Sequence, residues 1–279
     1  MPSLPQTETR SLIDEINMLP RVDRHNRFVL NPFKQKANAL REKHPDQCFL
    51  LLGVIATLEN KIDDVRHYFN QALQFGPRKL TYLNYAVSLS KLARIEEAVE
   101  MAWKAYLADP TDLHIIATNM DICISSGRIS RAAELANAWF RLCPDGTLRP
   151  ATALENMPAV FQKYEIDEDA LQNALTLVYK LLVERRIYTY SSQYAVSNDF
   201  LSFIYEVDIN KEECIALEQD AENIISEHLK GGALLTFDPI DNDLYEFIDS
   251  VDALIQSNPS IMVKADEEQM KRIADLLRE

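Results

Sequence analysis

The sequence predicts a mainly α-helical protein in which a solenoid-like array of helical hairpins is followed by a small acidic α/β domain. Three observations lead to this fold class. A motif repeats along the first half of the chain, and its closing prolines, Pro77, Pro110 and Pro144, are 33 and 34 residues apart. Only 6 glycines occur in 279 residues, which suits helices. After Arg186 the hydrophobic period changes from that of helices to that of strands.

The chain opens with a region that precedes the clearest repeats. Apolar residues at helical spacing predict a helix over residues 9–19. Pro32 is expected to lie in the first turn of a second helix, which ends at His44 because Pro45 follows. We expect this second helix to belong to a degenerate leading repeat, since terminal repeats have no neighbour on one side and are atypical.

Three hairpins are expected next, each built from two helices of similar length. Small residues such as Gly53, Ala72, Ala86 and Ala98 recur where the two helix backbones would approach closely. The expected turns contain Asn60-Lys61, Ala93-Arg94 and Gly127. The predicted helix pairs are 47–59 with 62–74, 80–92 with 95–108, and 112–125 with 129–142.

This pattern resembles the tetratricopeptide repeat, a helix–turn–helix unit of roughly 34 residues. The resemblance covers residues 32–144 and implies a solenoid in which the first helix of each repeat lines a concave groove. Such a groove usually binds a peptide or a helix, so the resemblance implies a protein-binding scaffold. The matching groove positions are Gln47, Leu50, Val54, Leu83, Asn84, Val87, His114, Thr118 and Asp121.

Some members of the tetratricopeptide family hold a C-terminal carboxylate with lysine, asparagine and arginine. The corresponding places here hold Leu50, Val54, Asn84, His114 and Thr118, of which only Asn84 matches. A carboxylate would be desolvated there without cationic partners, so we expect an amphipathic helix or an extended apolar peptide instead. The alternative is that the chain fills its own groove with its N-terminal helix or its linker, because proteins tend to cover apolar patches.

The array is expected to span residues 1–149 and to fold without the rest, with a linker over 150–166 and an acidic α/β domain over 167–279. In this domain Asp167 and Asn210 are expected to cap helices, and Ser197 to Asp199 form a turn. Residues 187–190 are rich in β-formers, and strict alternation predicts a strand over 203–209. Further expected elements are a helix over 211–230, strands at 233–238 and 261–263, and helices over 243–256 and 267–278.

Charge is distributed unevenly along the chain. Residues 1–150 hold 19 Lys and Arg against 17 Asp and Glu, a net charge of +2, so the remainder carries −16 and the whole chain −14. An acidic domain repels phosphates and anionic lipids, so we expect no nucleic acid and no membrane partner. It would attract a basic protein surface, although the acidity can also serve solubility alone.

Catalytic signals are weak in this sequence. It has no phosphate-binding glycine loop and no nucleophile elbow, and we expect no cofactor. Asp238, Asp241 and Asp243 could hold a divalent ion, but a polar turn that caps a helix explains them more simply. The four cysteines are far apart, which favours free thiols in a reducing cytoplasm, and no secretion signal or membrane span is evident.

We therefore expect a cytoplasmic adaptor that binds a protein partner through its groove and its acidic domain. One alternative is a neutralising protein, such as an antitoxin or immunity factor, whose acidic domain occludes a basic toxin or nuclease. Another is an enzyme or ligand-binding regulator housed in the α/β domain. The sequence alone does not indicate an oligomeric state.

Overall fold

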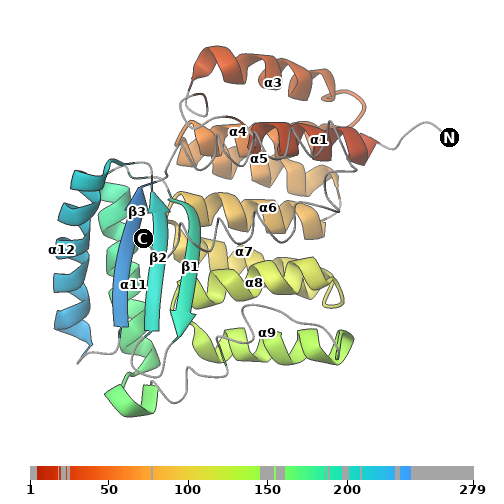
Figure 1. The fold of residues 1–279 in the computed structure, drawn as a ribbon. Coiled ribbons are helices and arrows are strands. Elements are labelled where there is room, and N and C mark those ends of the chain that lie inside the picture. The colour runs from red at the N-terminus through yellow and green to blue at the C-terminus, as the bar shows by residue number, and fades with distance from the viewer. Residues whose placement is uncertain are drawn as a thin grey trace, which may run out of the picture. The chain divides into compact units, whose positions relative to one another are not determined.

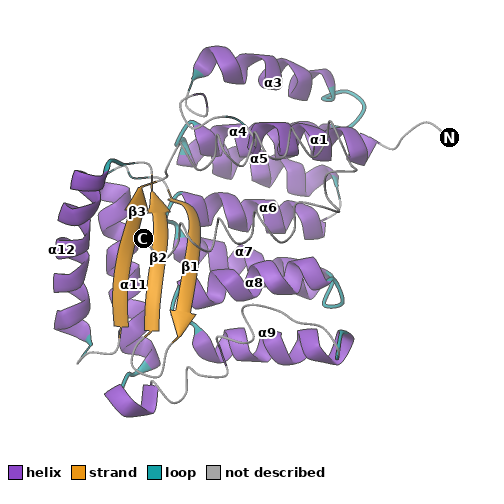
Figure 2. Cartoon of the chain, in the orientation of Figure 1, coloured by secondary structure: helices purple, strands orange, loops and turns teal. Residues whose placement is uncertain are grey.

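The computed structural model describes residues 5–17, 19, 23, 26–76, 78–144, 154, 161–185, 187, 189–196, 201–207, 209–229 and 233–239. All of the described residues belong to one compact unit within residues 1–239. The strand expected at 261–263 and the helices expected at 243–256 and 267–278 lie outside the described residues, as does the turn at 197–199. The described part is mainly helical, with one three-stranded sheet (Figures 1 and 2).

Three consecutive helical hairpins form the centre of the described part. Each hairpin joins two helices that pack closely, and each second helix also packs on the first helix of the next hairpin. The pairs are α4 (Pro45–Leu58) with α5 (Ile62–Phe75), α6 (Arg78–Lys91) with α7 (Ile95–Ala108), and α8 (Leu113–Ser125) with α9 (Ile129–Leu142). In Figure 1 they are stacked one below the other. Consecutive helices therefore pack in a repeat-like manner, with boundaries close to those expected.

The three turns inside the hairpins have the same backbone geometry. Asn60, Ala93 and Gly127 each have a positive φ, of 54°, 54° and 76°. The amide N–H that follows each of them donates to a carbonyl five residues earlier, as in a Schellman motif: Lys61 to Ala56 at 3.0 Å, and Arg94 to Leu89 and Arg128 to Cys123 at 2.8 Å. The turns recur every 33 or 34 residues, so the repeat seen in the sequence is also a repeat of backbone conformation.

The leading region differs from its expected boundaries. Helix α3 (Arg27–Ala39) begins five residues before Pro32, because the Asn26 side chain caps it by accepting the Phe28 N–H at 3.0 Å. Pro32 therefore lies inside the helix, where it leaves the Phe28 carbonyl without its helical donor. Phe28 is 87% exposed, so water can satisfy that carbonyl. Pro45, expected to follow a helix end, instead starts α4.

Helix α1 (Pro5–Asn17) packs on α4, as does α3. The Thr9 hydroxyl donates to Gln47 Oε1 at 2.5 Å, and Lys36 Nζ lies 3.2 Å from Glu15 Oε2, which joins α3 to α1. The same packing recurs further along the chain, where the first helix of one hairpin packs on the first helix of the next, as α4 does on α6. Helix α1 thus packs on α4 as α4 packs on α6, but it does not form a closely packed hairpin with α3.

The C-terminal part of this unit is an α/β arrangement packed on the array. Helix α11 (Glu168–Glu184) precedes β1 (Thr189–Val196), which pairs antiparallel with β2 (Leu201–Val207). Helix α12 (Lys211–His228) then crosses to β3 (Ala233–Pro239), which is parallel to β2, giving the order β1-β2-β3. The expected alternation is confirmed in β2, where Phe203, Tyr205 and Val207 are buried.

The buried side chains of the hairpins and of the α/β part belong to one continuous hydrophobic cluster. Gly127 marks the junction, because a Cβ there would lie 3.1 Å from the Gln172 backbone nitrogen and 3.2 Å from Leu175 Cδ1, both on α11. Helix α11 therefore rests directly on the third turn. Since the core crosses the boundary expected near residue 149, independent folding of the array stays a prediction.

Candidate functional site

The structure separates the expected groove residues into two groups. Seven of them are half-buried or exposed on the first helices of the three hairpins, and we call this set the A face: Gln47, Val54, Asn84, Val87, His114, Thr118 and Asp121. The other two are buried. Leu50 is 8% exposed, and Leu83 is 4% exposed and packs with Ala105 and Ile115. Leu50 and Leu83 therefore stabilise helix packing and leave little surface for a partner, which corrects their expected place among the groove residues.

Three polar members of the A face, Gln47, Asn84 and Asp121, already interact with other groups of the chain. Gln47 accepts the hydrogen bond from Thr9, so α1 lies against the α4 end of the face. The Asn84 amide donates to the Leu80 carbonyl of its own helix at 2.8 Å. The one position that matches a carboxylate clamp is thus engaged by its own backbone.

A cavity opens at the other end of the A face, where the α/β part meets α6 and α8. It has a volume of about 260 Å³. Val87, Thr118 and Asp121 of the A face contribute to it, and β1 packs on α8 beside it. Its full lining is Val87, Ser90, Lys91, Thr118, Asp121, Ile122, Ser125, Tyr179, Thr189 and Tyr205.

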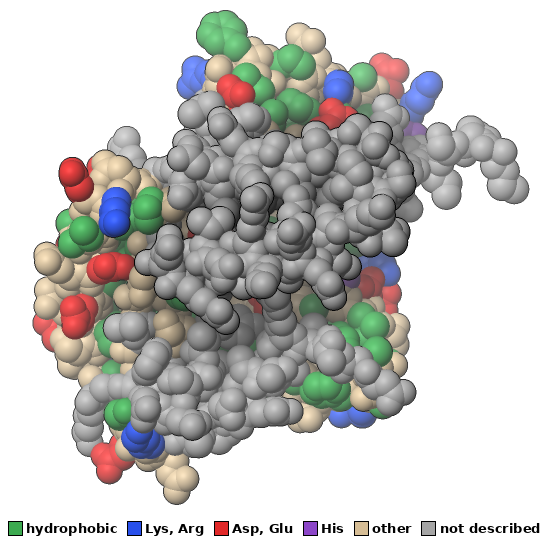
Figure 3. All heavy atoms as spheres, viewed as in Figure 1, with side chains coloured by type: hydrophobic (Ala, Val, Ile, Leu, Met, Phe, Trp, Pro, Cys, Tyr) green, Lys and Arg blue, Asp and Glu red, His purple; other side chains and the backbone are tan. Residues whose placement is uncertain are grey.

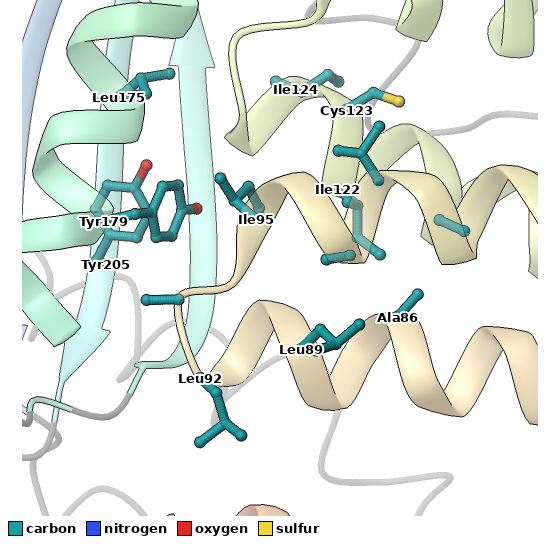
Figure 4. Packing of buried hydrophobic residues seen from close by; sticks show 14 of the residues in the cluster. Ala86, Leu89, Leu92, Ile95, Ile122, Cys123, Ile124, Leu175, Tyr179 and Tyr205 are labelled. Carbon is teal, nitrogen blue, oxygen red and sulfur yellow. The ribbon is translucent and has the colours of Figure 1, made fainter. Parts of the chain in front are cut away.

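Two buried tyrosines fix the inner wall of the cavity. Tyr179 of α11 and Tyr205 of β2 meet edge to face with ring centroids 5.7 Å apart, and both hydroxyls donate to the Ser125 carbonyl, at 3.2 and 3.3 Å. Figure 4 shows the two rings side by side, near the chain segment that carries Leu92 and Ile95. The Ser125 carbonyl belongs to the last turn of α8, which lacks helical donors, so the tyrosines cap that helix.

Burial keeps both tyrosines in their neutral form. It raises the pKa of Tyr179 and of Tyr205 above the ordinary value for a phenol. Both therefore remain hydrogen-bond donors to Ser125 at physiological pH. The part of the cavity wall that the two tyrosines form is therefore uncharged.

Sequence reasoning found part of this site and missed the rest. Ser90 and Lys91 follow Val87 by three and four residues on α6, and Ile122 and Ser125 bear the same relation to the A-face residues of α8. Helical periodicity could therefore have found them. Nothing in the local sequence links Tyr179, Thr189 or Tyr205 to the groove, because only the fold brings them there.

The described residues offer little for catalysis or metal binding. No three His, Cys, Asp or Glu side chains within this part of the chain are grouped as metal ligands would be. Burial raises the pKa of the Cys123 thiol to about 12, so this cysteine is not an activated nucleophile. The side chain of Asp238, and all of Asp241 and Asp243, lie outside the described residues. No described helix has both the length and the apolar character needed to span a membrane.

No protein-family model matches the sequence, and no curated protein matches it. What the chain binds must therefore be inferred from its own residues. The A face and the cavity are the candidate site, because they combine half-buried apolar side chains with a preformed hollow.

Proposed function

We propose that this protein is a scaffold of the tetratricopeptide type that binds a protein partner through the A face. The observation that carries the proposal is the threefold recurrence of one hairpin, with the same Schellman turn at Asn60, Ala93 and Gly127. Hairpins stacked with this period present equivalent positions of their first helices side by side. The A face is the surface that such a stack offers to a partner.

The apolar residues of the A face indicate what kind of partner fits. Val54 and Val87 occupy equivalent positions 33 residues apart, and both are half-buried. No described cation replaces the lysine and arginine of a carboxylate clamp at the expected places, and the Asn84 amide is already bonded. An amphipathic helix or an extended apolar segment therefore suits this surface better than a chain terminus.

The acidic C-terminal part is proposed to steer a basic partner towards the array. Helix α12 carries six Asp and Glu against one Lys. Glu212, Glu213, Glu222 and Glu227 are exposed, and Figure 3 shows acidic side chains gathered where α12 lies. Exposed charge of one sign accelerates association with an oppositely charged surface, and salt weakens that effect.

The same helix favours a second candidate function. Ile215 is 50% exposed within the acidic face of α12, which gives this face an apolar contact of its own. In a neutralising protein, α12 would cover a basic toxin or nuclease directly, and the A face would not be needed. The two candidates differ in which surface holds the partner.

Partner capture from the native cell, followed by quantitative mass spectrometry, tests the proposal. The bait is the full chain, compared with Val87→Asp on the A face, Glu222→Gln on α12, and Asn70→Asp on the exposed side of α5 as a matched control. We expect a partner that wild type and Asn70→Asp retain and Val87→Asp loses. Equal capture by Val87→Asp with loss in Glu222→Gln would refute the scaffold and favour neutralisation.

A further inference from the structure

The cavity between the array and the α/β part lies just below the size range of pockets for drug-sized molecules. Pockets for drug-sized molecules have volumes of about 300–1,000 Å³, whereas this one measures about 260 Å³. A hollow of this size on a protein-binding face can hold one inserted side chain. Interfaces are commonly anchored by a few such insertions, most often of Trp, Tyr or Arg.

The lining distinguishes among these three residue types. Val87 and Ile122 provide apolar contact, and the hydroxyls of Ser90, Thr118 and Thr189 can exchange hydrogen bonds with a polar tip. The Tyr179 and Tyr205 hydroxyls are already committed to the Ser125 carbonyl. The lining thus combines apolar side chains with a few neutral polar groups. An aromatic ring that carries one polar atom requires this environment.

A charged side chain meets a less favourable environment in the cavity. It would lose water on entry and would need a counter-charge to compensate. Lys91 and Asp121 are the charged residues of the lining, and they have opposite signs. Both already interact with other groups of the chain, so an incoming arginine or carboxylate would have to share its counter-charge with an existing partner.

From this geometry we infer that the cavity is an anchor site for a neutral aromatic side chain with a polar tip, tyrosine or tryptophan, of a bound protein. The inference rests on the proposed scaffold function and names the partner's chemistry at one point of the A face. It also gives the α/β part a role in the site, because β1, β2 and α11 supply the wall opposite α6 and α8.

Side-chain analogues test the inference without knowledge of the partner. The probes are p-cresol for tyrosine, indole for tryptophan and n-propylguanidinium for arginine, each titrated into the full chain labelled with ¹⁵N. We expect saturable shifts of the amides of Val87, Ser90, Thr118 and Ile122 with p-cresol or indole, and Kd values in the millimolar range. No saturable shift there with either aromatic probe, or tighter binding of n-propylguanidinium, would overturn the inference.

Two variants that fill the cavity sharpen the test. Thr118→Phe and Ser90→Leu place apolar groups in the hollow, and Asn70→Phe makes a matched change at an exposed residue of α5, outside both the lining and the A face. We expect at least a tenfold loss of probe affinity in a filling variant that keeps its melting temperature, and no loss in Asn70→Phe. Unchanged affinity in both filling variants would place the probes elsewhere and refute the site.

Capture experiments separate this inference from the function on which it rests. If Val87→Asp abolishes partner capture but the filling variants do not, the scaffold stands and the anchor site is wrong. If the aromatic probes bind in the cavity but capture is unaffected by every A-face change, the aromatic site stands and the scaffold function is wrong. Loss of capture in the filling variants and retention in Asn70→Phe would support both.

Discussion

Replacement of Gly127 by alanine should destabilise the protein more than an alanine at an equivalent turn. Gly127 has a φ of +76°, and a Cβ there would lie 3.1 Å from the Gln172 backbone nitrogen and 3.1 Å from Leu171 Cγ. A left-handed conformation costs an L-residue about 1–2 kcal/mol. Overpacking against α11 adds about 1–3 kcal/mol. We therefore expect a loss of about 2–5 kcal/mol in the free energy of unfolding.

The matched control is Asn60→Ala at the first turn. Asn60 also has a positive φ, of 54°, but its side chain is exposed. Alanine there therefore adds conformational strain to the backbone without overpacking against another helix. We expect it to cost about 1 kcal/mol, since asparagine tolerates this conformation better than alanine. Urea unfolding of both variants gives the comparison, and hydrogen exchange should show weaker protection of α11 in Gly127→Ala alone. Equal losses at the two turns would refute the docking of α11 on the third turn.

Three further predictions concern packing, the tyrosine pair and pH. Gly53→Ala should lower the free energy of unfolding by about 1–3 kcal/mol, because the added Cβ would lie 2.7 Å from the Phe69 ring. An unchanged midpoint of urea unfolding would contradict this packing. Tyr205→Phe should cost about 1 kcal/mol, since it removes one buried hydrogen bond, and a gain in stability would count against that bond. The pKa of Asp109 is lowered from 3.8 to about 2, chiefly by its hydrogen bond with Lys79, so its stabilising contribution is present above pH 3.8 and is lost as pH falls towards 2. Lys79→Met should therefore raise the pKa of Asp109 and make the free energy of unfolding less dependent on pH between about 2 and 3.8. A ¹³C titration of the Asp109 carboxyl in this variant that shows no rise in its pKa would contradict the role of Lys79.

The hairpins could be predicted closely because their signals are local. The second helices begin at Ile62, Ile95 and Ile129, where they were expected, since each follows a short turn fixed by a repeated period. Ala93 shows that the backbone keeps this turn even without glycine, at a residue that is less favourable there. The fold of each hairpin thus depends on spacing more than on one residue type.

Elements whose form depends on distant partners were harder to predict. Helix α3 is an exception, because the cause of its early start is local: the adjacent Asn26 side chain caps it, and Pro32 is accommodated inside the helix. Strand β1 was recognised only as a β-rich segment, because its pairing with β2 is set by the sheet. The cavity was out of reach for the same reason, since Tyr179 and Tyr205 reach it only through the packing of the α/β part on α8.

Hydrogen exchange of the full chain, with and without a captured and purified partner, tests the scaffold function most directly. We expect slower exchange on binding in α6 and α8, around Val87 and Thr118, because a partner on the A face excludes water from these helices. Slower exchange confined to α12, with α6 and α8 unchanged, would contradict the scaffold and leave recognition to the acidic helix.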